Sequence, residues 1–245
     1  MEWTDDAIVL SARPHGETSA IVTLLTLHQG RHAGLVRGGA GKRTRGILQP
    51  GNRVEARWRA RLAEHLGTLT CELTRAFAAG FLDDASRLAA LSAACAVTEA
   101  ALPEREPQPA GFEALLVLLE ALGGEHWPSV YVKWELGLLA DLGYGLDLTC
   151  CAATGANDQL AYVSPKSGRA VSLSAGEPYK NMLLPLPSFL LVEGASGDAG
   201  EVVDGLGLVG YFLERHVFIQ QRNPMPAARR RLVERLRGES NKGIG

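Results

Sequence analysis

Residues 53–61 place a charged side chain at every second position. The charged positions are Arg53, Glu55, Arg57, Arg59 and Arg61, and the residues between them are Val54, Ala56, Trp58 and Ala60. A period of two is the pleat of a β-strand that buries one face and leaves the other in water. The segment is therefore predicted to be a surface strand whose wet face carries four guanidiniums and one carboxylate.

These four arginines, here called the arginine stripe, allow two interpretations. Side chains on one face of a strand repeat about every 6.6 Å, roughly twice the phosphate rise of about 3.4 Å along one strand of B-form DNA. The stripe could follow a nucleic-acid backbone without reading its sequence. Arginine is also common on the solvated face of a small barrel, so the stripe alone does not decide between the two.

The first 75 residues carry β-rich or alternating segments separated by polar, glycine-containing breaks. The segments are residues 7–13, 18–27, 31–37, 53–62 and 66–75. Five short strands at this spacing predict a small closed barrel, which has no exposed sheet edge to protect. Among five-stranded barrels that bind nucleic acid, the OB-fold is the expected one.

From Phe81 the spacing of apolar residues changes to three and four, which indicates helices. Asp83 and Asp84 are predicted to cap the first of them, and Pro128 to lie in the first turn of the third. Trp58 and Trp134 lie on apolar faces and are predicted to be core residues. The expected helices have apolar faces at residues 88–95, 112–122 and 131–142, with two later helices at roughly 200–221 and 227–237, the last of them basic.

Charge is distributed unevenly along the chain. Residues 1–75 hold 11 Lys/Arg and 7 Asp/Glu, a net charge of +4, whereas residues 76–150 hold 3 and 11, a net charge of -8. Such a division indicates different partners for different parts of the protein.

A basic, glycine-rich segment at residues 37–46 follows the third predicted strand and reads RGGAGKRTRG. Glycines allow a backbone to approach a phosphate closely, and Lys42, Arg43 and Arg45 supply positive charge there. The segment lacks the G-x-x-x-x-G-K-[ST] pattern of a P-loop, so it does not predict nucleotide hydrolysis. A solvated, flexible turn is the alternative interpretation.

The cysteine and histidine patterns argue against a metal site and against catalysis. Cys150 and Cys151 have no second pair downstream, and the chain has no histidine between His126 and His216. Free thiols and no bound metal or cofactor are therefore expected. No H-E-x-x-H or G-x-S-x-G pattern occurs, although residues that meet only in the folded protein could still form an active site.

The amino terminus has neither the basic region nor the apolar region of a secretory leader. The longest apolar stretches fall short of the roughly 18 residues that a membrane-spanning helix requires. We therefore expect a cytoplasmic protein without a membrane segment.

Three blocks of residues, taken in chain order, carry a family resemblance. The first comprises residues 13–20, Thr26, Gly30 and residues 37–51, the second is the middle helices that end in LGYGLD at residues 142–147, and the third is the segment from Cys151 to Ser172. A further match is YKNMLLPLPSFL at residues 179–190. Together they resemble the bacterial RecO family of recombination mediators. The resemblance covers nearly the whole chain, although each motif alone has modest specificity.

The resemblance implies an α+β multidomain protein. It implies an OB-fold DNA-binding domain at residues 1–79, a helical domain at 80–148 and 176–240, and a zinc-ribbon-like insertion at 149–175. Zinc-binding members carry four cysteines, whereas this chain has Cys151 followed by Thr154, Ser172 and Ala175 at the other three positions. Because one thiolate cannot hold a structural zinc, the insertion is expected to be metal-free and held by hydrogen bonds and by packing around Tyr162.

The resemblance also implies a function that is not enzymatic. Such a mediator binds single- and double-stranded DNA, anneals complementary strands, engages the acidic carboxyl-terminal tail of the single-stranded DNA-binding protein SSB, and with RecR helps to load RecA in gap repair, in the cytoplasm at the nucleoid. Surface cations suit annealing, since two polyanions approach only when their charge is neutralised. The residues expected to contact DNA are Arg37, Lys42, Arg43 and Arg45, then Arg57, Arg59 and Arg61, with Arg31 as a weaker candidate.

The site for the SSB tail and the function itself each allow more than one interpretation. The sequence does not locate the groove for the SSB tail, although the basic helix near residues 229–237 could supply charge for it. The alternative function is an OB-fold scaffold that binds protein and does not contact DNA. Salt separates the two functions, because DNA affinity falls steeply as salt rises.

Overall fold

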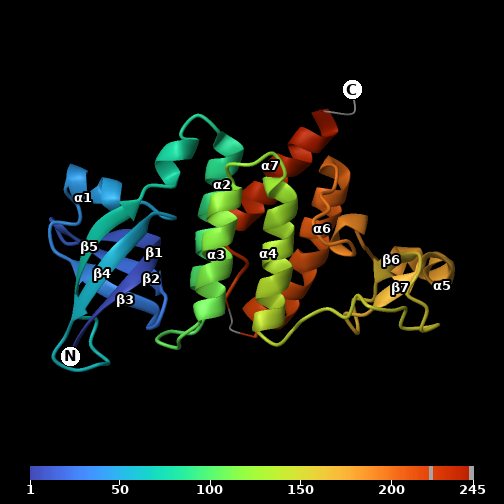
Figure 1. Cartoon of the computed structure of the whole chain (residues 1–245), viewed down its shortest axis with the longest axis horizontal. Helices are drawn as coiled ribbons and strands as arrows, with labels where there is room; N and C mark the ends of the chain where they lie inside the picture. The colour runs from blue at the N-terminus through green and yellow to red at the C-terminus, as the bar shows by residue number, and fades with distance from the viewer. Residues whose placement is uncertain (221–222, 243–245) are drawn as a thin grey trace. The chain divides into compact units, whose positions relative to one another are not determined.

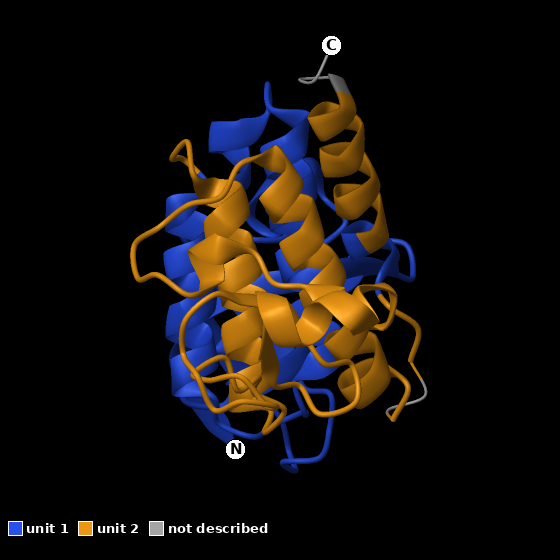
Figure 2. Cartoon of the chain, turned by 90° about the vertical axis from the view of Figure 1, so that its right-hand side faces the viewer, with its two compact units in different colours: residues 1–122, 226–229 blue, residues 123–225, 230–245 orange. Residues whose placement is uncertain are grey.

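The structure is a computed structural model that describes residues 1–220 and 223–242. The chain divides into two compact units (Figure 2). Unit 1 comprises Met1–Leu122 with Pro226–Arg229, and unit 2 comprises Gly123–Met225 with Arg230–Gly245. These boundaries follow packing, and the predicted division into residues 1–79, 80–148 with 176–240, and 149–175 stays a prediction.

Unit 1 begins with the predicted five-stranded barrel, drawn in blue to cyan in Figure 1. The strands join in the closed order β1-β2-β3-β5-β4, in which β3 and β5 pair in parallel and the other neighbours pair antiparallel. This arrangement confirms the OB-like fold class. The strands are β1 (Glu2–His15), β2 (Ser19–Thr26), β3 (Gly30–Val36), β4 (Arg53–Arg59) and β5 (Thr68–Arg75).

Strand β4 has the two faces that its alternation predicts. Val54, Ala56 and Trp58 are 0–2 % exposed in the barrel core, while Arg57 and Arg59 face outward. The predicted end at residue 62 was wrong, because the chain leaves the sheet after Arg59. The indole of Trp58 donates to the carbonyl of Leu66 at 2.9 Å, and this bond holds the returning loop against the barrel.

Residues 37–46 fold differently from the predicted loop. After a turn they form a short helix, α1 (Lys42–Ile47). Leu48, which follows α1, is 2 % exposed in the barrel core. The Asn52 amide donates to the carbonyls of Gly46 and Ile47 at 3.0 and 3.1 Å and so satisfies backbone groups that a helix end leaves unpaired. The segment is therefore held at its end.

The helices of unit 1 follow the barrel. They are η1 (Ala78–Phe81), α2 (Ala85–Ala101) and α3 (Pro109–Ala121). Asp84 confirms the predicted cap, since its carboxylate accepts from the backbone N–H groups of Ser86 and Arg87 at 3.0 Å. Helix α2 packs on β1, where the Cys95 thiol points to the Val9 carbonyl at 3.7 Å.

Unit 2 contains α4 (Trp127–Asp141) and α6 (Ala199–Phe212), and the latter continues as η4 (Leu213–Phe218). Pro128 lies in the first turn of α4 and Trp134 is buried, as predicted. A Cβ on Gly205 would lie 2.8 Å from Val132, so this glycine permits the close approach of α6 to α4. The predicted helix at 200–221 corresponds to α6 and η4, and its residue 221 lies outside the described residues.

The last helix, α7 (Ala227–Lys242), extends the predicted 227–237 helix. The predicted insertion, residues 149–175, contains β6 and β7, while β8 lies beyond its predicted end and completes a small antiparallel sheet in the order β7-β6-β8, shown in gold and orange in Figure 1. No described helix is both long enough and apolar enough to cross a bilayer. The elements of this part are β6 (Leu160–Val163), β7 (Ala170–Ser172), α5 (Leu173–Gly176), η2 (Glu177–Met182), β8 (Leu184–Pro185) and η3 (Ser188–Leu190).

Candidate nucleic-acid interface

The predicted cations of residues 37–46 lie at one end of the barrel. Pro14 pairs with Ala20 beside the β1–β2 turn, and Ala20 pairs with Val36 at the end of β3. The Ala40 N–H donates to the Thr18 carbonyl at 3.0 Å, which fastens the segment to that turn. We call Arg37, Lys42, Arg43 and Arg45 the basic segment.

All four side chains of the basic segment are exposed. Within residues 1–220 and 223–242, none of them forms an ion pair with a carboxylate. Their positive charges are therefore available to an external anion. The phosphates of a nucleic-acid backbone are such anions, and lysine and arginine bind them well.

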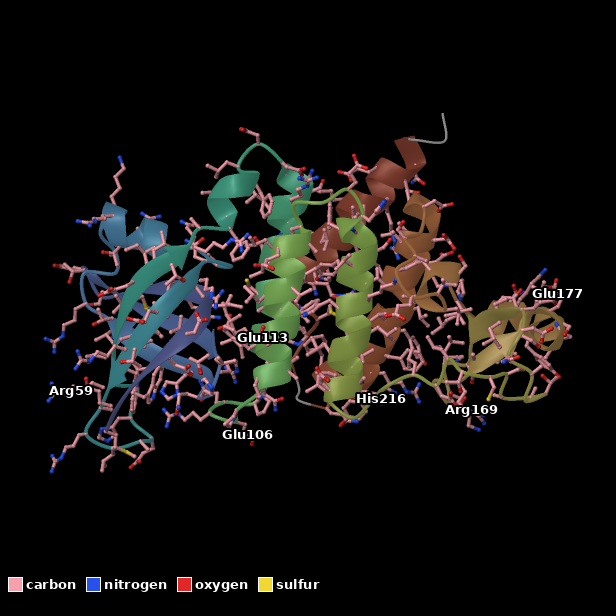
Figure 3. All side chains as sticks on the ribbon, viewed as in Figure 1. Arg59, Glu106, Glu113, Arg169, Glu177 and His216 are labelled. Atoms are coloured by element: carbon pink, nitrogen blue, oxygen red, sulfur yellow. The ribbon has the colours of Figure 1, made fainter. Side chains whose placement is uncertain are left out.

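The arginine stripe lies in different surroundings. Arg53 donates from Nε to both carboxylate oxygens of Asp6 at 2.9 and 3.0 Å, and this hydrogen bonding raises the pKa of Arg53. Arg57 forms an ion pair with Glu2. Arg59 is exposed and points outward from the barrel (Figure 3), and Arg61 lies in the loop after β4.

The stripe also runs away from the basic segment. Arg53 pairs with Ile8, near the middle of β1, whereas Arg59 pairs with Glu2 at its start. The basic segment lies near Pro14, towards the other end of β1. Arg59 follows Arg53 by six residue steps along the strand, a span of about 20 Å. The structure therefore does not bring the predicted residues Arg57, Arg59 and Arg61 together with the basic segment.

Arg31 makes internal contacts. Its Nε donates to the Leu102 carbonyl at 2.8 Å, and its Nη1 lies 3.2 Å from the Glu104 carboxylate. Only 18 % of its side chain is exposed. The guanidinium thus joins β3 to the segment after α2 and is not free to bind a phosphate.

A pocket of about 280 Å³ adjoins the basic segment within unit 1. Strand β1 lines the pocket with residues that follow its bulge between Val9 and Ser11. These residues lie beyond the part of β1 that pairs with β4. Sequence reasoning missed this pocket, because its lining comes from distant positions of the chain and has no shared motif. The lining includes Pro14, Ala20, Ala40, Arg45, Gln49 and Pro50.

The insertion brings three of the four degenerate zinc positions into one small cluster. The Ser172 N–H donates to the Cys151 sulfur at 3.2 Å. Hydrogen bonds from Ser172 and from Thr154 lower the pKa of the Cys151 thiol to about 6. Among the described residues, no three His, Cys, Asp or Glu side chains gather in a way that could hold a metal ion.

Packing around Tyr162 accompanies these bonds. A Cβ on Gly176 would lie 2.4 Å from the Tyr162 ring, so the ring rests against the backbone of α5. The Tyr162 hydroxyl reaches Glu177 at 3.4 Å, and Glu177 is labelled in Figure 3. Hydrogen bonds at Cys151 and this aromatic contact at Tyr162 thus join the strands and turns of this segment.

A second pocket, of about 200 Å³, lies in unit 2 beside the start of α4. Its lining includes Glu125, Asp198 and Glu239, a charge that does not suit an acidic peptide. In α7, Arg229 is 5 % exposed, while Arg231 and Arg235 are exposed. This pocket therefore does not have the charge that an acidic peptide would require.

Comparison with known proteins gives matches over most of the chain. A family model described as "Recombination protein O N terminal" matches residues 1–77, and one described as "Recombination protein O C terminal" matches residues 82–224. A protein of Rhodospirillum centenum, named DNA repair protein RecO, is 64% identical over 239 residues, which are 97% of this chain and 95% of that protein.

Two further relatives carry the same name. The protein of Rhodospirillum rubrum is 56% identical over 97% of each chain. The protein of Phenylobacterium zucineum is 53% identical over 96% of this chain and 98% of its own length. The matches therefore cover both the barrel and the helical part.

Proposed function

We propose that this chain, which belongs to the RecO family of DNA repair and recombination proteins, binds single- and double-stranded DNA through its barrel and anneals complementary strands. It is a recombination mediator and not an enzyme. In this proposal, residues 1–79 act as the DNA-binding domain, and binding is indifferent to sequence because it is made to phosphates.

The observation that carries the proposal is the basic segment. Arg37, Lys42, Arg43 and Arg45 are exposed and have no carboxylate partner among the described residues, so DNA does not have to displace an internal ion pair. Annealing requires neutralisation of the charge on two polyanions, and a rigidly attached group of cations provides it without a covalent step. Arg59 and Arg61 extend the positive surface, while Arg57 contributes less because of Glu2.

The proposal includes the partners that the family implies. The protein engages the acidic tail of SSB and acts with RecR to promote RecA loading in gap repair, in the cytoplasm at the nucleoid. The tail binds at a place outside the acidic pocket of unit 2, since like charges repel. The exposed arginines of α7, Arg231 and Arg235 among them, are the cations proposed to receive it.

Two measurements test the proposal. Equilibrium titrations of single- and double-stranded DNA over a range of salt should give a linear fall of log affinity with log salt, with a slope of about -0.9 per phosphate contact on duplex DNA. Negligible affinity for both DNAs at low salt would favour the alternative, an OB-fold scaffold that binds only protein.

Strand annealing is the second measurement. Complementary strands coated with SSB should anneal faster when the protein is added, and a peptide with the acidic tail sequence of SSB should reduce that effect. Unchanged annealing rates would refute the mediator role even if DNA binding were observed.

A further inference from the structure

The pocket beside the basic segment has walls of small and flat side chains. Ala20 and Ala40 leave space that any larger side chain would fill, and the rings of Pro14 and Pro50 provide flat aliphatic surfaces. Its volume of about 280 Å³ lies at the lower limit of ligand pockets, about 300 Å³. The space is therefore suited to one small planar group.

The backbone around the pocket is constrained so that the space stays open. A Cβ on Gly39 would lie 2.8 Å from the Ala20 Cβ and 2.9 Å from the Val36 carbonyl oxygen, so only glycine lets the segment pass this close to the barrel. Gly38 has φ +68°, a conformation that side chains rarely adopt. The wall that the segment forms is thus set by the two glycines and by the bond from Ala40 to Thr18.

Polar groups are present at one side of the same pocket. Arg45 and Gln49 both belong to its lining, and the Gln49 amide donates to the Arg45 carbonyl at 3.3 Å. A guanidinium and an amide can form hydrogen bonds with the edge of a planar heterocycle, while the apolar proline rings cover its face and exclude water from it. The other cations of the basic segment extend from α1 and from the end of β3.

We propose that this pocket accepts one unpaired nucleobase of single-stranded DNA, while the basic segment binds the phosphates on either side of that nucleotide. The inference rests on the proposed function and deepens it. Charge complementarity selects the occupant, because the cations beside the pocket have no acidic partner among the described residues and a nucleotide brings its own phosphates.

This arrangement distinguishes single-stranded from double-stranded DNA. A base in a duplex is stacked and paired, and it has to be flipped out before it can enter a pocket. A single strand offers its bases without that penalty. At equal numbers of phosphate contacts, the protein should therefore bind single strands more tightly than duplexes. Changes to the pocket should alter this preference, whereas changes to the cations should alter the salt dependence of binding.

The test compares oligonucleotides that differ only in their bases. Fluorescence anisotropy with the full chain measures affinity for a thymidine oligonucleotide of about 12 nucleotides and for an abasic oligonucleotide with the same number of phosphates. We expect the wild-type protein to bind the thymidine oligonucleotide about tenfold more tightly, because one base buries part of its apolar surface in the pocket. Equal affinities would overturn the inference.

Two variants locate the effect. Ala40→Phe fills the pocket and Pro50→Ala removes one flat wall, and each should reduce the thymidine preference while leaving the salt slope unchanged. Ala63→Phe makes the same chemical change as the first variant on an exposed loop residue and should leave the preference intact. Since Pro50→Ala introduces no larger side chain, it remains informative if Ala40→Phe fails to fold.

The outcomes separate this inference from the proposed function. Salt-dependent binding without a base preference, or a preference that both pocket variants retain, would overturn the pocket alone. Absence of salt-dependent binding to either oligonucleotide would overturn the proposed function and the pocket together. An acidic peptide that binds the wild type but not Ala40→Phe, in the absence of a base preference, would assign the pocket to a protein partner and likewise overturn the inference.

Discussion

The basic segment and the arginine stripe both belong to the barrel and are both rich in cations, but they differ in the charges that surround them. Arg53 and Arg57 of the stripe are paired with Asp6 and Glu2 on the neighbouring strand. The cations of the basic segment have no such partner among the described residues. The number of arginines in a segment is therefore a poor measure of the charge that it offers to a ligand.

The largest difference should appear in DNA affinity when each region loses three cations. We expect the triple variant Lys42→Ala, Arg43→Ala, Arg45→Ala to flatten the salt slope on duplex DNA by about 2.7 units, because three phosphate contacts are lost. At about 1 kcal/mol per contact, affinity should fall on the order of a hundredfold. Anisotropy titrations at several salt concentrations measure both quantities.

The matched control removes three cations from the stripe region. Arg57→Ala, Arg59→Ala, Arg61→Ala makes the same change in net charge, but we expect less than about a threefold loss, because charges beyond a Debye length act weakly on the bound DNA. Equal losses in the two triple variants would show that net charge alone decides affinity, and the contrast between the regions would then have no functional meaning.

Acid pH should act on the barrel that carries both regions and not on their cations. His32 is 5 % exposed and packs edge-on against the rings of Trp3 and Trp58, which stack on each other, with centroid distances of 5.1 and 4.8 Å. Burial, together with the charge of Arg105 and against that of Glu104, lowers the pKa of His32 to about 4. Lysine and arginine stay protonated over this range.

The sign of the stability change follows from that direction. Between pH 6.5 and 4 the unfolded chain binds a proton at His32 and the folded chain does not, so stability falls as pH falls. The free energy of unfolding should drop by about 2 kcal/mol between pH 7 and pH 5 through this group. Denaturant titrations at both pH values measure it.

A control histidine makes this measurement specific. His32→Phe should remove most of the pH dependence, whereas His65→Gln, at an exposed position, should retain it. If both variants kept the full dependence, the acid sensitivity would come from groups other than His32. At either pH, the DNA affinity of the folded protein should still differ between the triple variant of the basic segment and the triple variant of the stripe.

Sequence reasoning succeeded where the signal is local. The alternation at residues 53–59 predicts a strand with Val54 and Trp58 inside, since the pleat requires only neighbouring residues to be known. The cap at Asp84 is local for the same reason. The five-stranded barrel follows from the spacing of such segments.

What could not be predicted depends on residues distant in sequence. The ion pair of Arg57 with Glu2 requires the register of β4 against β1, which places Trp58 opposite Trp3. The start of β1 at Glu2 depends on the same pairing. Helix α1 was predicted as a loop because glycines and arginines do not indicate a helix, whereas Asn52 and buried Leu48 hold it in the folded protein.

A smaller effect concerns the role of the paired acids in stability. Asp6 binds Arg53 through several hydrogen bonds across the β1–β4 seam, and both side chains are about one-third exposed. Asp6→Ala should therefore lower the free energy of unfolding by about 1 kcal/mol. Glu17→Ala, which removes an exposed acid from the β1–β2 turn, should change it by less than about 0.5 kcal/mol. Equal changes in the two variants would show that the Asp6–Arg53 pair does not stabilise the pairing of β1 with β4.

The smallest effect tests whether pairing is what withholds the stripe from DNA. Glu2→Gln releases Arg57 and should raise affinity for a DNA long enough to reach β4 by about twofold, because one phosphate contact at an exposed site contributes less than about 1 kcal/mol. Glu55→Gln makes the same charge change on β4 at an acid that has no ion pair among the described residues, so it should raise affinity less. The ratio of the DNA affinities of the two variants separates the effect of the Glu2–Arg57 ion pair from the effect of net charge. The measurement is made at physiological salt, where long-range charge is screened. A ratio of one would mean that Arg57 contributes equally little to DNA binding with or without Glu2. The small contribution of the stripe would then follow from its position, far along β1 from the basic segment.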